Sequence, residues 1–103
     1  MPIDCPGYED RRSFIITDTP AEWDAEADSV TKSYNDWVKN QSCKNECIKS
    51  SLVYNRGAQR ATYKDKEVWA GEVWVRVICH HRGFRLRIEE DDFPVSTPWQ
   101  PLK

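Results

Sequence analysis

The stretch VWVRVICHHRGFRLRIE, residues 73–89, decides the fold class because two sets of side chains alternate along it, one of them apolar and the other mostly aromatic or basic. In an extended strand, successive side chains point to opposite faces of the sheet. The stretch therefore predicts a two-faced antiparallel hairpin that turns at residues 81–83. Its apolar face holds Val73, Val75, Val77, Cys79, Phe84, Leu86 and Ile88. Its other face carries Trp74, Arg76, His80, Arg85 and Arg87 and is a candidate working surface.

An amphipathic helix is expected over residues 20–39, where it would cover the apolar face. Thr19 and Glu22 form a capping box around Pro20, which suits the first helical position. A stripe of apolar residues at helical spacing follows. The expected core combines this stripe with the sheet residues: Phe14, Ile16, Trp23, Ala27, Val30, Tyr34, Trp37, Val73, Val75, Val77, Phe84, Leu86 and Ile88.

The rest of the chain predicts one α+β domain over residues 1–103, with a mostly antiparallel sheet of four or five strands. Further strands are expected at residues 13–17, 51–54, 58–63 and 67–80, with turns at 55–57 and 64–66 and a bulge at 70–71. A short helix or helical continuation is expected at residues 43–49. Residues 1–12 are expected to form an irregular arm and residues 93–103 an irregular Pro-rich tail.

Composition narrows the classes of function. The 103 residues carry a net charge of −2, which argues against attraction of the whole molecule to nucleic acid or anionic lipid. No apolar run approaches the roughly 20 residues that a membrane span needs. Residues 1–10 lack a signal-peptide pattern, so we expect a cytoplasmic protein, in the host cytoplasm if a virus or phage encodes it.

Four cysteines leave two chemistries open. In the expected cytoplasm Cys5, Cys43, Cys47 and Cys79 would be reduced thiols, whereas an oxidising compartment would pair them in one of three ways. Zinc is the other alternative, through Cys43, Cys47 and Cys79 with His80 or His81, although adjacent residues of one strand diverge. The simpler interpretation makes Cys47 and Cys79 small buried residues, so no cofactor is expected.

No catalytic motif is present: the chain lacks a Gly-x-Ser-x-Gly, a P-loop, a dinucleotide fingerprint and a His-Glu-x-x-His. The acidic run at residues 89–92 lacks the spacing of a calcium loop and suits the end of a strand. We therefore expect a protein that is not an enzyme.

The polar face of the hairpin is the expected binding site, because Trp and Arg lead the residues that carry binding energy in interfaces. The predicted site comprises Trp74, Arg76, Arg82, Arg85, Arg87 and Trp99. The leading hypothesis is a small adaptor, inhibitor or immunity-type protein, of the kind that phages and mobile elements encode, binding an acidic protein surface. The alternatives are nucleic acid on the same face and a face that is merely solvated. An exposed sheet edge offers a homodimer as well.

Overall fold

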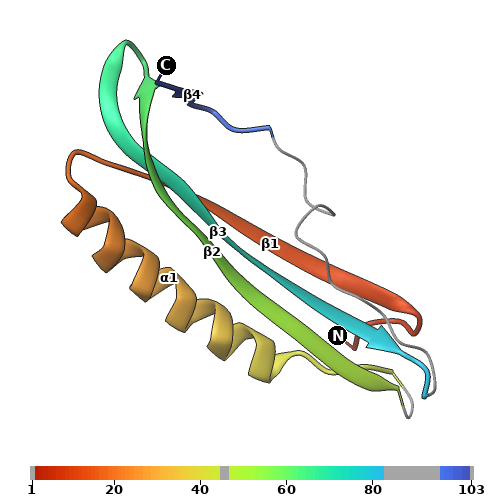
Figure 1. The fold of residues 1–103 in the computed structure, drawn as a ribbon. Coiled ribbons are helices and arrows are strands. Elements are labelled where there is room, and N and C mark those ends of the chain that lie inside the picture. Colours follow the sequence, from red (N-terminus) through yellow and green to blue (C-terminus); the bar gives the residue numbers. More distant parts are fainter. Residues whose placement is uncertain (1, 45–46, 83–95, 103) are drawn as a thin grey trace.

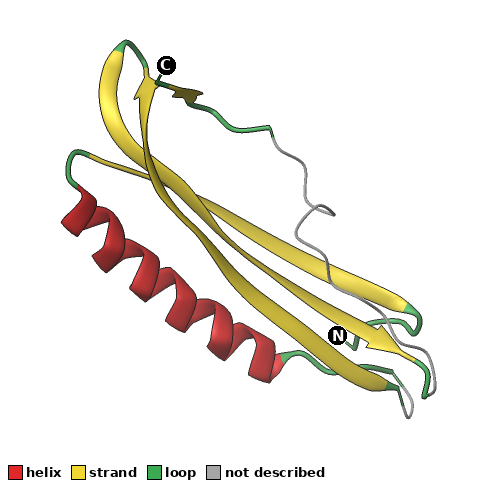
Figure 2. Cartoon of the chain, in the orientation of Figure 1, coloured by secondary structure: helices red, strands yellow, loops and turns green. Residues whose placement is uncertain are grey.

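The computed structural model describes residues 2–44, 47–82 and 96–102 and contains one helix packed against a four-stranded antiparallel sheet (Figure 1). The elements are β1 (Gly7–Thr17), α1 (Pro20–Asn40), β2 (Ile48–Tyr63), β3 (Lys66–His80) and β4 (Gln100–Pro101). Figure 2 shows α1 on one side of the sheet only. The predicted α+β class is confirmed. No helix among the described residues is both long and apolar enough to cross a membrane.

The helix begins where its capping residues predict. Thr19 has an extended backbone, and its hydroxyl accepts a hydrogen bond from the backbone N–H of Glu22 at 3.2 Å. Pro20 follows in the first helical position, where its missing N–H costs nothing. The buried residues of α1 are Trp23, Ala27 and Tyr34, at spacings of four and seven that place them on one helical face.

The central strand of the sheet is β3, and the strand order is β1-β3-β2-β4. Both β1 and β2 pair antiparallel with β3, so they run parallel to each other with α1 as the crossover between them. The strands β2 and β3 form a hairpin across Lys64 and Asp65, whose positive φ values of 51° and 63° suit a tight two-residue turn. The turn predicted at residues 64–66 is therefore present.

The predicted pairing of residues 73–80 with residues 84–89 is wrong, because β3 has a neighbour on each of its edges. Cys79 faces Gly7 of β1 on one side and Lys49 of β2 on the other. The alternation along β3 is nevertheless as expected, with Val73 and Val75 packed towards α1. Residues 83–95, and with them Phe84, Arg85, Leu86, Arg87 and Ile88, lie outside the described residues.

The predicted turn at residues 55–57 is a β-bulge inside one continuous strand. Asn55 pairs with Val73 and Ala58 with Gly71, so two residues of β2 oppose one of β3. Gly57 has a φ of 78°, and its N–H donates to the Asn55 side chain at 2.7 Å. The bulge expected at residues 70–71 thus lies on the opposite strand.

Two N-terminal predictions also need correction. The strand β1 begins at Gly7, inside the predicted irregular arm, and so extends six residues further towards the N-terminus than the expected start at Ser13. Instead of opening a short helix, Cys43 forms an isolated parallel bridge with Ile3. The backbone N–H of Ile3 donates to the carbonyl of Ser42 at 2.8 Å. The chain before β1 is therefore tied to the end of α1.

The core lies between α1 and β3. Trp23 is fully buried there, and its indole N–H donates to the carbonyl of Ile15 at 3.0 Å. Gly71 makes this packing possible, because a Cβ at that position would lie 2.1 Å from the carbonyl oxygen of Gly57 and 2.6 Å from the Trp23 ring. Phe14 was expected in this core but lies on the other face, exposed.

A second apolar cluster covers the opposite face near the β2–β3 turn. Ala61, Val68, Ala70 and Trp99 form it, with Ile16 packed at its edge. Trp99 reaches it because β4 pairs with Ala61 and Thr62 of β2. Part of the expected irregular tail is therefore a short edge strand.

Candidate functional site: the open face and the outer edge of β1

The face of the sheet opposite α1, here called the open face, carries the residues that the sequence assigned to partner binding. Trp74 and Arg76 project from β3 onto it, but they are 0% and 9% exposed. The Tyr54 ring packs on the Trp74 ring at 5.2 Å between centroids. A partner at the surface would therefore not touch Trp74. The predicted role of these two residues in binding stays a prediction.

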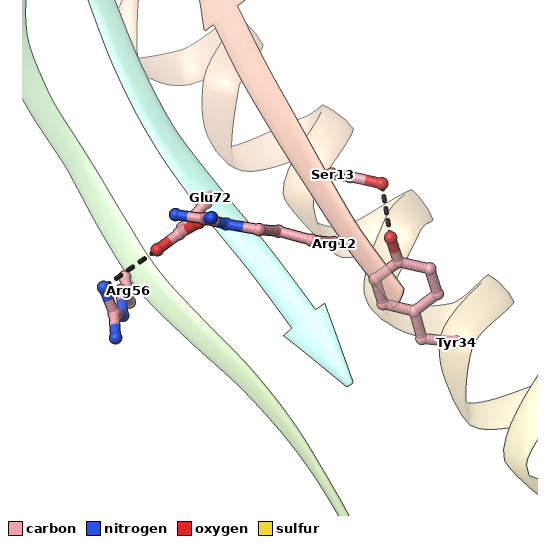
Figure 3. Close-up of polar contacts among 5 residues, drawn as sticks. All are labelled: Arg12, Ser13, Tyr34, Arg56 and Glu72. Atoms are coloured by element: carbon pink, nitrogen blue, oxygen red, sulfur yellow. Dashed lines mark hydrogen bonds and ion pairs between the residues drawn. The ribbon is translucent and has the colours of Figure 1, made fainter. Parts of the chain in front are cut away.

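A buried carboxylate organises the middle of the open face. Glu72 is 3% exposed and lies between Arg12 of β1 and Arg56 of the β2 bulge (Figure 3). Arg12 Nε donates to Glu72 Oε2, and Arg56 Nη1 lies 2.9 Å from Glu72 Oε1. Ser13 projects to the opposite side of β1 (Figure 3), and its hydroxyl lies 2.5 Å from the Tyr34 hydroxyl of α1. Neighbouring residues of β1 thus anchor both faces.

A second ion pair fixes the N-terminal part of β1 to β3. Arg76 donates from Nε and Nη2 to the two carboxylate oxygens of Asp10, at 2.6 and 2.8 Å. The same guanidinium lies over the Tyr8 ring, 4.7 Å from its centroid. Bidentate pairs of this kind fix geometry as well as adding stability. Arg76 therefore orients two residues of the edge strand.

The outer edge of β1 is one place where the described part of the open face meets solvent. Tyr8 is 62% exposed and Phe14 is 41% exposed, and both project onto the open face. Between them Glu9, Asp10 and Arg11 are exposed as well. Within residues 2–44, 47–82 and 96–102, β1 pairs only with β3, so no described strand pairs with its outer edge.

The remaining predicted contact residues are spread apart. Trp99 is buried, and its ring meets Phe14 edge-on at 5.4 Å. Arg82 is exposed just after β3. Arg85 and Arg87 lie outside the described residues. Tyr8 was missed because it falls in the stretch expected to be irregular, although the alternation Tyr8, Asp10, Arg12 is visible in the sequence.

The predicted zinc ligands have other partners in this structure. Cys43 forms a disulfide with Cys79, and Cys47 forms one with Cys5, so none of the four sulfurs is a free thiolate. His81 is exposed and lies with Cys5 and Cys47 in a group whose ligand atoms are within 4.8 Å. In this structure the three cysteines of the predicted zinc set, Cys43, Cys47 and Cys79, therefore take part in two covalent cross-links.

His80 is also occupied. Its Nδ1 lies 3.1 Å from the carbonyl oxygen of His81, which can only accept, and its Nε2 lies 3.0 Å from the Ser50 hydroxyl, which can donate or accept. A hydroxyl next to an imidazole is also the geometry of an activated nucleophile. Here the pair satisfies both nitrogens of a buried ring on neighbouring strands, which is what a buried imidazole needs.

A cleft of about 780 Å³ lies where the start of α1 meets the β2–β3 turn. Carboxylates of Asp18 and Glu22 and the amines of Lys64 and Lys66 share its wall. Lys66 Nζ lies 2.7 Å from Asp18 Oδ1, and this hydrogen bond and the Asp18 charge raise the pKa of Lys66 above 10.5, against a small opposing effect of burial. Both side chains are exposed, so the cleft is an open, charged groove.

Comparisons with protein-family models, with curated protein sequences and with solved structures find no match to this chain.

Proposed function

We propose that this chain is a small protein-binding module without enzymatic activity, and that it binds through the outer edge of β1. The observation that carries the proposal is the pair of exposed rings, Tyr8 and Phe14, on one face of an edge strand. Exposed aromatic residues beside an edge without a described partner are unusual, because sheets generally protect their edges with charge or cover.

An edge strand offers its backbone N–H and C=O groups to an incoming extended segment. Such a segment adds a strand to the sheet, with backbone hydrogen bonds for affinity and side-chain contacts for specificity. Tyr8, Phe14 and Arg11 are residue types that are enriched in protein interfaces. Arg76 contributes from below the surface, since it fixes Asp10 and supports the Tyr8 ring.

The acidic partner expected from the sequence fits Arg82, the exposed arginine among the described residues of the predicted site. Arg85 and Arg87 follow it in the sequence and lie outside the described residues. Arg12, Arg56 and Arg76, in contrast, each face a carboxylate of this chain. Two carboxylates, Glu72 and Asp10, offset two of these three positive charges, so the open face favours a protein partner over a polyanion such as nucleic acid.

The two disulfides support an oxidising compartment rather than the cytoplasm expected from the sequence. Small domains with several disulfides belong to such compartments, because cytosolic reductants keep thiols reduced. Protein taken from its source with its thiols blocked by an alkylating reagent should carry no alkyl group. Four alkylated cysteines would contradict this assignment.

The proposal is tested with a variant that changes only the exposed edge. Tyr8→Lys combined with Phe14→Lys removes both exposed rings and keeps every residue of the two ion-pair networks, and Ile48→Lys is the matched control because Ile48 is an exposed apolar residue on β2. The immobilised wild-type protein and the control variant should both retain a binding protein, which is either a different protein or a tagged second copy of this chain. The double variant should not retain it. Equal retention by all three would refute binding through β1.

A further inference from the structure

The order of charges along β1 identifies the occupant of its outer edge. We propose that two copies of this chain pair antiparallel through β1, with Arg11 of one copy opposite Arg11 of the other. The inference depends on the proposed function, because it names the partner of the same edge. The two copies would form one continuous sheet of eight strands, four from each copy.

The central charges of β1 are self-complementary in one direction only. Glu9 and Asp10 are followed by Arg11 and Arg12, two acids and then two bases. Antiparallel pairing sets the acidic half of one copy against the basic half of the other. Parallel pairing in register would set like charges directly opposite each other, which destabilises a pair of strands. The sequence of charges therefore selects the antiparallel arrangement.

The faces of the sheet then select the register. A two-fold axis normal to the sheet keeps each side chain on its own face, so a residue of the open face must meet another residue of the open face. With the axis at Arg11, Asp10 lies opposite Arg12 of the second copy, and Tyr8 lies opposite Phe14 of the second copy. Opposite Cβ atoms are about 4.5–5.5 Å apart in such pairs. Both exposed rings thereby gain an aromatic neighbour, and each pairing occurs twice.

A register with the two-fold axis at Asp10 gives less favourable contacts between the same residues. An axis at Asp10 gains contacts between Glu9 and Arg11, but it sets the two Asp10 carboxylates against each other. It also leaves Phe14 beyond the end of the opposing strand, which begins at Gly7. The Arg11 register therefore places both exposed rings against the second copy, whereas the Asp10 register places only the Tyr8 ring there.

The ion pairs of the open face would extend across this interface. Within one copy Glu72 is paired with Arg12, and Arg76 with Asp10. Placing Arg12 beside Asp10 of the second copy joins the two pairs, so that the charges alternate from Glu72 of one copy to Arg76 of the other. Alternating charge across an interface fixes register more than it adds affinity.

The arginine at the axis is the main cost of this register. Arg11 of one copy would lie opposite Arg11 of the second copy, and these like charges repel. Each guanidinium, however, lies 4.8 Å from the centroid of the Trp37 ring in its own chain. Glu9 of the second copy is its diagonal neighbour on the same face, close enough for a long side chain to reach. The repulsion is therefore offset by charge of the opposite sign.

Mixed charge on an edge strand is also a common protection against aggregation. A run of charges of one sign would protect the edge against aggregation equally well. Protection against aggregation also gives no reason for Tyr8 and Phe14 to be exposed beside these charges. Self-complementary charge together with aromatic residues placed to meet each other is what a specific contact between two copies requires.

Sedimentation velocity from about 1 to 100 µM tests the inference on the intact, oxidised protein. Wild-type protein should sediment as a dimer in the upper part of this range, and Phe14→Lys should weaken the dimer by at least about tenfold, because each copy loses an aromatic contact. Ile48→Lys should leave the dimer unchanged. A wild-type monomer throughout, or a dimer that Phe14→Lys does not weaken, would overturn the inference.

Cysteine cross-linking reads the register directly. Directly opposite Cα atoms are about 4.5–5.5 Å apart, within the span of a disulfide, so Arg11→Cys should form a cross-linked dimer faster than Asp10→Cys. The reverse order would overturn the Arg11 register. A monomer that still captures another protein through Tyr8 and Phe14 would refute the dimer and leave the proposed function standing, whereas a monomer without any such capture would refute both.

Discussion

Replacing Glu72 with Gln measures what the buried carboxylate contributes to the sheet. Glu72 is 3% exposed and meets guanidinium groups from strands on both sides of β3, Arg12 and Arg56. Removing one partner of a buried ion pair costs about 3–5 kcal/mol, because the opposite charge stays buried. Gln keeps an oxygen that accepts a hydrogen bond, so we expect the free energy of unfolding to fall by about 3 kcal/mol, the low end of this range.

Urea unfolding followed by tryptophan fluorescence, with both disulfides intact, is the appropriate assay. The midpoint should fall while the slope with denaturant stays the same, which would show that stability rather than compactness has changed. Glu67→Gln is the matched control, because Glu67 meets Arg60 at the same 2.9 Å but is 65% exposed. Exposed pairs are worth about 0–1 kcal/mol.

Two results would refute this reasoning. One is a loss for Glu72→Gln no larger than that for Glu67→Gln, which would mean that the open-face network is screened like a surface pair. The other is a loss that disappears at about 1 M salt, since salt screens exposed charges far more than buried ones. A large loss that persists in salt supports the buried network.

The remaining predictions concern the cross-links and the charged cleft. Cys43→Ser with Cys79→Ser should lower the free energy of unfolding by about 3–4 kcal/mol, because the disulfide joins residues 36 apart; urea unfolding without a loss would contradict this. The pKa of Lys66, followed by NMR, should lie above 10.5 and return to it in Asp18→Asn. A raised lysine pKa stabilises the fold below its unfolded value, so this contribution should fade as the pH rises through the folded value.

Local signals in the sequence predicted the local structure well. The capping residues and apolar spacing gave a helix from Pro20 to about Lys39, and the structure ends it at Asn40. Alternation identified β3 and its two faces, and the turn residues at 64–66 identified the β2–β3 hairpin. Each of these features depends on residues within a few positions of each other.

The second neighbour of β3 could not be predicted in this way. A short turn after His80 made residues 84–89 the expected partner, but β1 takes that edge from far away in the sequence. Pairing between distant strands leaves no local trace, because its register depends on which residues α1 and the disulfides bring together. The disulfide between Cys43 and Cys79 fastens the end of β3 beside the end of α1.

The solvent exposure of the side chains on the open face could not be predicted from the sequence either. The alternation of Trp74 and Arg76 showed which face they occupy, but burial depends on what lies over that face in three dimensions. Phe14 was expected in the core because it is apolar, and it is 41% exposed because its position in β1 turns it away from α1. Sequence patterns assign a side chain to a face, and only tertiary structure determines whether solvent reaches it.

A buried residue of the predicted site still has a route to function. Arg76 is 9% exposed, and it holds the carboxylate of Asp10 and lies against the ring of Tyr8. Both of those residues face the proposed second copy. Strand β3 therefore orders the exposed edge of β1 in advance, and less conformational freedom is lost when a partner binds. In this arrangement the hidden arginine sets the geometry of the contact, and the exposed aromatic residues make it.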